Sequence, residues 1–488
     1  MEWLQAPDYW LARLVFQRAL GAVYLVAFLV ALNQFRPLLG EAGLLPVPRF
    51  LEAVPFRRAP SIFHLRYSDR LLAAVAWGGV LLAGAAVAGL SEAGPIWFSA
   101  LVWSALWALY LSIVNVGQVF YAFGWESLLL EAGFLAIFLG PADMAPPTLV
   151  IVAIRWLLFR LEVGAGLIKL RGDRCWRDLT CLHYHHETQP LPNPLSWFFH
   201  HLPEPVHKVE VVANHFAQLV VPVGLFAPQP LASVAGATIV ATQGWLLVSG
   251  NFSWLNVLTV VLAAASFDDA VLGPFVPARP GPLAPPPGWH QAAVVALAVL
   301  VAGLSWRVVR NMASRRQRMN TSFDPLHLVN TYGAFGSVTR QRYEVVLEGT
   351  DAAVLDAATA WAEYEFKGKP GDPSRRPPQV APYHLRLDWL MWFVALRGPM
   401  DHRWLLALVR RLLRNDRPTL RLLRTNPFPD RPPAFVRARL YRYRFTTREE
   451  RRETGAWWVR TPVGELLRPL SLGEGDDAHR PPPPPPPL

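Results

Sequence analysis

Charged residues are scarce in this sequence. They make up 17% of its 488 residues, whereas a soluble globular domain averages about 25%. Apolar residues, in contrast, make up 52% of the chain. This balance disfavours an ordinary soluble protein and indicates a large part embedded in a membrane.

Cysteine is rarer still, because Cys175 and Cys181 are the only two in the chain. Two cysteines exclude the disulfide framework of a small secreted protein. Their Cys-x5-Cys spacing also differs from the CxxC pair of redox enzymes. On an oxidising side of a membrane they would form a local disulfide that tightens a loop, and on a reducing side they would stay as inert thiols. The sequence leaves both states open.

Motifs for catalysis and for nucleic-acid recognition are absent. The chain has no Gly-x-Ser-x-Gly and no cysteine–histidine signature of a nucleophile. Its net charge of +11 comes without any nucleic-acid-binding motif. We therefore expect no catalytic residue, no cofactor and no nucleic-acid partner, and an activity as an enzyme is disfavoured.

What the sequence has is long apolar runs, each near the ~20 helical residues that span a bilayer. They lack the alternating pattern of barrel strands, so a polytopic all-α membrane bundle is expected. Two runs, 125–140 and 252–267, are short, and the predicted number of transmembrane helices is therefore five to nine. The nine runs cover residues 10–33, 71–90, 96–116, 125–140, 148–170, 208–227, 231–249, 252–267 and 289–309.

Charge divides the chain into two parts. The first 306 residues hold 16 Lys and Arg against 17 Asp and Glu, and the rest hold 31 against 19. We expect a transmembrane domain over 1–310, a basic soluble domain over 311–470 and a disordered proline-rich tail over 471–488. With nine spans, the Arg-rich loops and the basic domain share one side, which the positive-inside rule predicts to be cytoplasmic.

The basic domain is predicted to be mixed α/β or β-rich. Alternating apolar and polar residues predict strands over 342–350, 363–367 and 435–447. Helical spacing appears over 384–396 and 403–414. We expect these two helices to pack on a small sheet, and the alternative is that they lie on the membrane surface.

Six charged residues fall inside the apolar runs, where an unpaired charge costs about 2.5–3.5 kcal/mol. They are expected to form ion pairs that fix the helices in register. The alternative is a polar cavity for a lipid, a quinone or a client segment, in which the chain would be a membrane-embedded enzyme. These intramembrane candidates are Glu126, Glu131, Arg155, Arg160, Glu162 and Lys169.

Histidines cluster downstream of the cysteines. Imidazole and carboxylate groups are metal ligands, but the spacing here matches neither HExxH nor another familiar zinc motif. We expect no metal, and the weak candidates are His183, His185, His186 and Glu187.

Four stretches resemble the lipase maturation factor family. They cover residues 9–51, 117–139 (which contains GWESLLLEAGFLAIFL), 155–197 and 328–350 (which begins LVNTYGAFGSVT). They occur in the family's order and touch both parts of the chain. The Arg, Ala and Pro bias of the sequence suits a bacterial member.

The resemblance implies a multi-pass protein that helps secreted lipases, such as lipoprotein lipase, to fold and assemble, without chemistry of its own. Its partners would be membrane lipids and lipase-like clients. The family resides in the endoplasmic reticulum membrane, and a bacterial member would reside in the inner membrane. The client-facing domain begins, by resemblance, with Asn330, Thr331, Tyr332, Gly333, Phe335 and Gly336.

Overall fold

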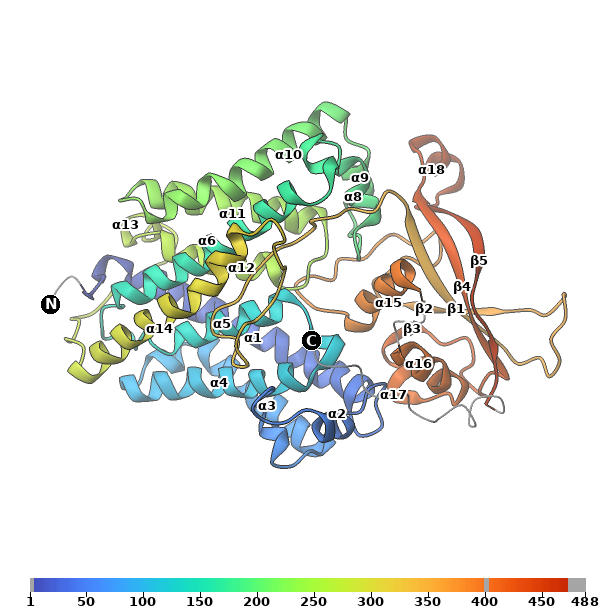
Figure 1. Ribbon diagram of the computed structural model, residues 1–488, viewed down its shortest axis with the longest axis horizontal. Helices are drawn as coiled ribbons and strands as arrows, with labels where there is room; N and C mark the ends of the chain where they lie inside the picture. The colour runs from blue at the N-terminus through green and yellow to red at the C-terminus, as the bar shows by residue number, and fades with distance from the viewer. Residues whose placement is uncertain (1–3, 399–402, 473–488) are drawn as a thin grey trace.

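The computed structural model describes residues 4–398 and 403–472. A bundle of helices forms one part, and a sheet with its own helices lies at one end of that bundle (Figure 1). This arrangement confirms the expected fold class, a helical membrane bundle followed by a mixed α/β domain. The proline-rich tail predicted over 471–488 lies, from residue 473 onward, outside the described residues.

The bundle is built from nine helices longer than eight residues among the described residues. Six of them, two extended by a 3-10 turn, are long and apolar enough to cross a membrane, within the predicted five to nine. These six are α1 (Trp10–Leu39), α3 (Asp69–Val87), α4 (Ile96–Val116), α10 (Glu204–Leu219), α11 (Leu231–Ser249) and α14 (Gly288–Ala313).

The other three helices are short or charged. Helix α5 (Gly124–Ala136) has 13 residues and α12 (Leu255–Ala263) has 9. Helix α6 (Thr148–Arg171) has 24 residues, but five of them are charged. All three are largely buried by other helices, so their polar groups can be satisfied by protein rather than by lipid. Shorter helices complete the bundle: α2 (Val47–Ala53), α7 (Arg174–Arg177), α8 (Leu182–Thr188), α9 (Ser196–His200) and α13 (Asp269–Leu272).

The described chain begins at the end of the bundle that lies away from the sheet (Figure 1). Helix α1 runs from there toward the sheet, where Gln34 accepts a hydrogen bond from the amide of Arg386 at 3.0 Å. The loop after α1 also reaches the sheet domain, because Arg411 donates to the carbonyl of Ala42. The Arg-rich loop before α3 and the C-terminal domain therefore lie at the same end.

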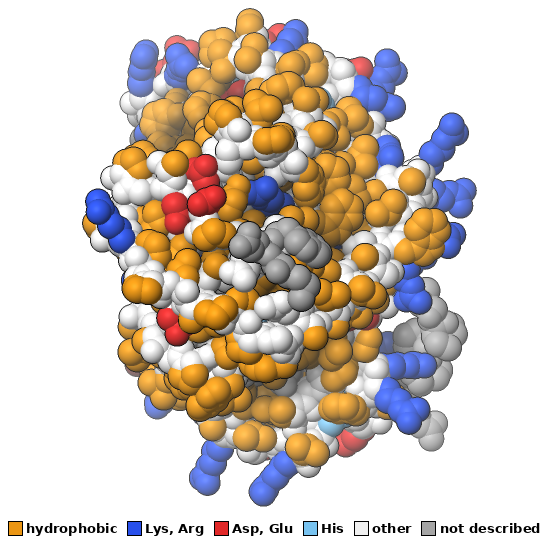
Figure 2. All heavy atoms as spheres, turned by 90° about the vertical axis from the view of Figure 1, so that its left-hand side faces the viewer, with side chains coloured by type: hydrophobic (Ala, Val, Ile, Leu, Met, Phe, Trp, Pro, Cys, Tyr) orange, Lys and Arg blue, Asp and Glu red, His pale blue; other side chains and the backbone are white. Residues whose placement is uncertain are grey.

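Figure 2 shows the opposite end of the bundle. Its surface is mainly hydrophobic and uncharged, with a few acidic side chains, while Lys and Arg lie mostly at the margin of the view. Acidic residues of this end include Glu92, Asp143 and Asp269, all of which act on Arg13 of α1. The molecule is thus polarised, with basic loops at the sheet end and acidic loops at the other.

The C-terminal domain contains one antiparallel sheet in the order β3-β2-β1-β4-β5. The strand pattern of the sequence located β1, β2 and β4 to within two residues at each end, but it missed the two edge strands. The strands are β1 (Arg342–Thr350), β2 (Ala362–Phe366), β3 (Leu423–Thr425), β4 (Phe435–Phe445) and β5 (Trp458–Leu470).

Helices α15 (Arg386–Arg397) and α16 (Arg403–Leu413) lie between the sheet and the bundle (Figure 1). Helix α16 buries Leu405, Leu408 and Leu412 completely. These side chains share a core with the sheet residues Val345 and Leu347. The helices therefore pack on the sheet as expected. Of two short helices, α17 (Arg417–Leu420) precedes the edge strand β3, and α18 (Arg448–Thr454) joins β4 to β5 at the end of these strands (Figure 1).

Helix packing in the bundle relies on a glycine of α3. A Cβ atom at Gly79 would collide with the ring of Phe28 on α1, whereas a Cβ atom at Gly84 of the same helix would meet nothing within 4 Å. We predict that Gly79→Val lowers the free energy of unfolding by about 1–3 kcal/mol, because it overpacks the α1–α3 contact. The measurement is thermal unfolding in detergent, monitored by tryptophan fluorescence.

Gly84→Val is the matched control and should unfold like the original protein. Equal effects of the two substitutions would contradict the packing assigned to Gly79.

Candidate functional site

The C-terminal domain meets the bundle at two buried carboxylates of α5. Glu126 and Glu131 are 0% and 1% exposed, and both were predicted as polar groups at membrane depth. Each carboxylate forms an ion pair with an arginine. For Glu126 this arginine is Arg386 of the C-terminal domain, and Glu131 in addition binds Asn330. We call this contact the interdomain junction.

Glu126 is bound from the C-terminal domain by Arg386. Nη1 of Arg386 donates to Oε1 of Glu126 at 2.8 Å and to the carbonyl of Phe120 at 2.7 Å. Its guanidinium also stacks on Tyr121, with Cζ 3.4 Å from the ring centre. Tyr110 of α4 donates its hydroxyl to the other oxygen of Glu126. The first turn of α15 is thereby fixed to the bundle by a fully buried ion pair.

His384 lies beside this pair with its ring 0% exposed. Burial, followed by the positive charge of Arg386, lowers the pKa of His384 to about 4. The ring is therefore neutral at physiological pH. Its Nδ1 lies 3.7 Å from Oε1 of Glu126 and 3.4 Å from Nε1 of Trp125, which donates to it. The carboxylate consequently has a single cationic partner, Arg386, at this site.

Glu131 is bound from both sides of the junction. Arg160 of α6 forms an ion pair with one of its oxygens. The other oxygen accepts the hydroxyl of Tyr332 at 2.7 Å, and the amide and side chain of Asn330 at 3.1 and 3.0 Å. Arg160 also donates to the carbonyl of Asn330 at 2.8 Å. A short segment that enters the C-terminal domain is thus held by an ion pair inside the bundle.

The segment 330–336 continues along α6 in close backbone contact. A Cβ atom at Gly164 would lie 2.5 Å from the carbonyl oxygen of Tyr332, so only glycine allows this approach. Farther on, the amide of Asp173 donates to the carbonyl of Gly336 at 2.7 Å. Asn330, Thr331 and Tyr332 are at most 2% exposed. These residues join the two parts of the molecule, and contact with a client through them stays a prediction.

The remaining intramembrane candidates form hydrogen bonds within the bundle, although Nη2 of Arg155 is buried without a partner among the described residues. Arg155 donates to the carbonyl of Ala265 at 2.8 Å. Glu162 accepts the side-chain amide of Gln243 at 2.8 Å, and Lys169 donates to Gln218 at 2.8 Å. None of the six candidates lines the cavity of about 380 Å³ beside α9 and α18. Their contacts fit the expected role of fixing the helices in register.

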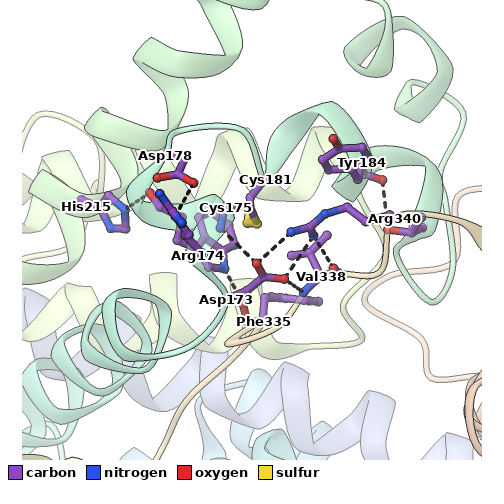
Figure 3. The surroundings of a disulfide bond; sticks show 12 residues. Asp173, Arg174, Cys175, Asp178, Cys181, Tyr184, His215, Phe335, Val338 and Arg340 are labelled. Atoms are coloured by element: carbon purple, nitrogen blue, oxygen red, sulfur yellow. Dashed lines mark hydrogen bonds and ion pairs between the residues drawn. A yellow bond between two sulfur atoms is a disulfide. The ribbon is translucent and has the colours of Figure 1, made fainter.

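A disulfide joins Cys175 and Cys181 on the loop after α6, with the two Cα atoms 4.8 Å apart (Figure 3). Asp173 caps α7 at the amide of Cys175 and forms an ion pair with Arg340 at 2.8 Å. The hydrogen bond from Arg340 holds the pKa of Asp173 at about 2. The disulfide loop is therefore tied to the start of the C-terminal domain and lies at the sheet end of the bundle.

The weak metal candidates next to this loop face different partners. His185 packs edge-on against the ring of Phe335, at 4.9 Å between ring centres. Glu187 accepts the amide of Phe445 on β4 at 2.7 Å. His183 and His186 lie near the ring of His207 on α10. The four residues named from the sequence thus do not form one ligand set by themselves.

Two junction residues escaped the sequence analysis. Arg386 lies in the stretch 384–396 that was predicted to be helical, but it was not singled out from the sequence, although it is fully buried. Arg342 of β1 donates to the carbonyls of Glu187 and Pro190 at 3.0 Å each, and it pairs with the buried Glu344 beside it. The only signal for either was an arginine next to apolar residues, which is also common at a solvated surface.

Comparison with known proteins covers both parts of the molecule. The family model described as the lipase maturation factor transmembrane domain matches residues 11–274, and the model described as the lipase maturation factor C-terminal domain matches 328–468. Lipase maturation factor 1 of Bos taurus is 46% identical over 96% of this chain and 90% of its own length. The protein of that name from Homo sapiens is 45% identical over the same shares.

Lipase maturation factor 2 of Homo sapiens is more distant, at 31% identity over 95% of this chain and 83% of its own length. No solved structure matches the chain.

Breaking the junction from the C-terminal side should destabilise the whole molecule. We predict that Arg386→Met lowers the free energy of unfolding by about 3–5 kcal/mol, because Glu126 is left buried without its cation. The double variant Glu126→Leu with Arg386→Met should recover more than half of this loss, since no charge then remains buried. Thermal unfolding of the four proteins of this cycle is the measurement.

Arg397→Met, at the exposed end of the same helix, is the control and should change stability by less than about 0.5 kcal/mol. A double variant as unstable as the sum of the two single variants would show that Glu126 and Arg386 do not depend on each other.

Proposed function

The chain belongs to the lipase maturation factor family, and we propose that it assists the folding and assembly of secreted lipases without chemistry of its own. The observation that carries this proposal is the 46% identity to lipase maturation factor 1 of Bos taurus along 96% of the chain. A likeness of this extent includes the bundle, the C-terminal domain and the junction between them. The clients would be lipase-like proteins, as the names of these relatives state.

The contacts of the polar candidates support a role without catalysis. Glu126, Glu131 and Arg160 are engaged in bonds that hold the C-terminal domain on the bundle. A membrane-embedded enzyme would need such groups free to face a substrate. No observation in the described residues favours that alternative over the maturation role.

The proposal includes a side of the membrane for the C-terminal domain. Secreted lipases fold in an oxidising compartment, and structural disulfides are rare outside such compartments. The disulfide of Cys175 and Cys181 lies at the same end of the bundle as this domain. The disulfide supports placing the domain in the lumen of the endoplasmic reticulum. The Arg-rich loops favour the cytoplasmic side, but we give the disulfide more weight because the positive-inside rule is statistical and has exceptions.

Clients would meet the C-terminal domain on its outer side. The edge strand β5 is exposed along its middle, residues 461–465, and the long loop between β1 and β2 is also largely exposed. The side chains of Asn330 and Tyr332 would become available only if the junction opened. We therefore assign the first contact with a client to the exposed part of the sheet.

The proposed side is testable with one substitution. Ala357→Asn creates the glycosylation sequon Asn-Ala-Thr at 357–359, in the exposed loop after β1. We expect this variant, made in animal cells, to gain a glycan that endoglycosidase removes, because the loop would face the lumen. The readout is the shift in gel mobility against the original chain, which already carries Asn-Phe-Ser at 251–253 and Asn-Thr-Ser at 320–322.

Adding Thr359→Ala destroys the new sequon and should abolish the shift. An unshifted Ala357→Asn variant whose C-terminal domain is cut by protease added outside sealed microsomes would contradict a lumenal domain.

The maturation role itself is testable in cells that lack their own maturation factor and express a lipase that requires one. We expect the full chain to restore the secreted lipase activity per unit of lipase mass, and Arg386→Met to restore far less because its C-terminal domain is poorly held. Arg397→Met should restore activity like the original chain. A correctly inserted full chain that restores nothing would overturn the proposal.

A further inference from the structure

His186 of α8 is buried with neither ring nitrogen bonded. Its side chain is 3% exposed, and both Nδ1 and Nε2 have no hydrogen-bond partner among the described residues. A buried polar atom without a partner costs about 1–3 kcal/mol. An imidazole with two such atoms therefore needs an explanation, for example a ligand that takes one nitrogen.

Two further metal-ligand groups lie next to it. His207 and Glu210, three residues apart on one face of α10, each place a ligand atom within 4.8 Å of that of His186 and of each other. His207 is 2% exposed, so the group is shielded from water. The three residues come from two helices that pack together at the sheet end of the bundle (Figure 1).

The surroundings orient two of these groups as in a built metal site. Nε2 of His207 lies 3.4 Å from the carbonyl of His200, which leaves Nδ1 for a ligand. Oε1 of Glu210 accepts Nε1 of Trp245 at 2.8 Å, which leaves Oε2 for the same ligand. In protein metal sites, ligating histidines and carboxylates are oriented by outer hydrogen bonds of this kind.

The ligand atoms are spaced for a small cation. Nδ1 of His207 and Oε2 of Glu210 lie 3.1 Å apart and contact each other, and a cation between them would replace this contact. A tetrahedral zinc ion with bonds of about 2.0–2.1 Å holds its ligand atoms about 3.3 Å apart. The ligand atom of His186 lies within 4.8 Å of the other two, so it would need to approach by at most about 1.5 Å to complete this geometry.

We infer that His186, His207 and Glu210 bind a zinc ion, with water in the fourth position. Two imidazoles and one carboxylate form a familiar zinc ligand set, and harder ions such as Mg²⁺ prefer oxygen ligands. An imidazole binds a metal in its neutral form, through the lone pair of one ring nitrogen.

The site would fasten α8 to α10. The chain just after His186 provides the carbonyl of Glu187 to Arg342 of β1, and Glu187 also accepts the amide of Phe445 on β4. A zinc ion here would hold α8 on α10, and α8 in turn contacts β1 and β4. The ion would therefore help to hold the sheet on the bundle. This role does not depend on which clients the protein serves.

The test is the metal content and the metal response of the purified full chain. We expect about one zinc per chain by elemental analysis, as this ligand set predicts. Stripping with a membrane-permeant zinc chelator should lower the unfolding temperature by a few degrees, and added Zn²⁺, but not Mg²⁺, should restore it. This part uses only the original protein, so it stands even if a variant fails to fold.

His186→Ala and Glu210→Gln should each lose most of the zinc while remaining monodisperse. His215→Ala is the matched control on α10, where this histidine contacts the carbonyl of Trp176 rather than the proposed site, and it should keep its zinc. Original protein that is free of zinc and whose unfolding temperature ignores added Zn²⁺ would overturn the inference, as would zinc retained in both site variants.

Discussion

The buried pairing of Glu126 with Arg386 is the interaction on which the architecture depends. Removing two charges from water costs several kcal/mol for each ion, and the cost is recovered only when geometry and further hydrogen bonds are good. Here the carbonyl of Phe120 accepts a second hydrogen bond from Arg386, the hydroxyl of Tyr110 donates to Glu126, and the guanidinium stacks on the ring of Tyr121. Nε and Nη2 of Arg386 have no hydrogen-bond partner among the described residues, so the pair depends mainly on its Coulomb attraction and on these contacts. The carboxylate belongs to the bundle and the guanidinium to the C-terminal domain, so neither part buries its charge satisfactorily alone.

Other contacts at the same end of the bundle also attach the C-terminal domain to it. Glu131 holds Asn330 and Tyr332, Asp173 holds Arg340 beside the disulfide, and Arg342 holds the chain after α8. The C-terminal domain is therefore attached along its entry segment, through α15 and through β1. The membrane bundle thereby fixes the sheet in position.

The sequence predicted the parts of the fold that follow from repeated local patterns. The length of the apolar runs located the spanning helices, and the alternation of apolar and polar residues located β1 and β4. Strand β5 was missed because Pro462, Gly464 and Pro469 interrupt any alternation, which an edge strand tolerates since one side of its backbone is unpaired. The carboxylates of α5 were found because charge is costly at membrane depth. The pairing of these carboxylates with Arg386 and Asn330 was not predicted, because no local pattern records a contact across roughly 200 residues or more of chain.

The attachment of the C-terminal domain is tested most directly by hydrogen–deuterium exchange on the full chain in lipid nanodiscs. The account predicts slow exchange for the amides of Asn330 and Arg386, which donate to Glu131 and to Gln34 inside the bundle. Substituting Arg386 by Met should speed exchange at both sites while the central amides of α4 stay protected. Exchange in the original protein as fast over 328–336 and 384–388 as in the exposed loop after β1 would contradict a domain held by buried ion pairs.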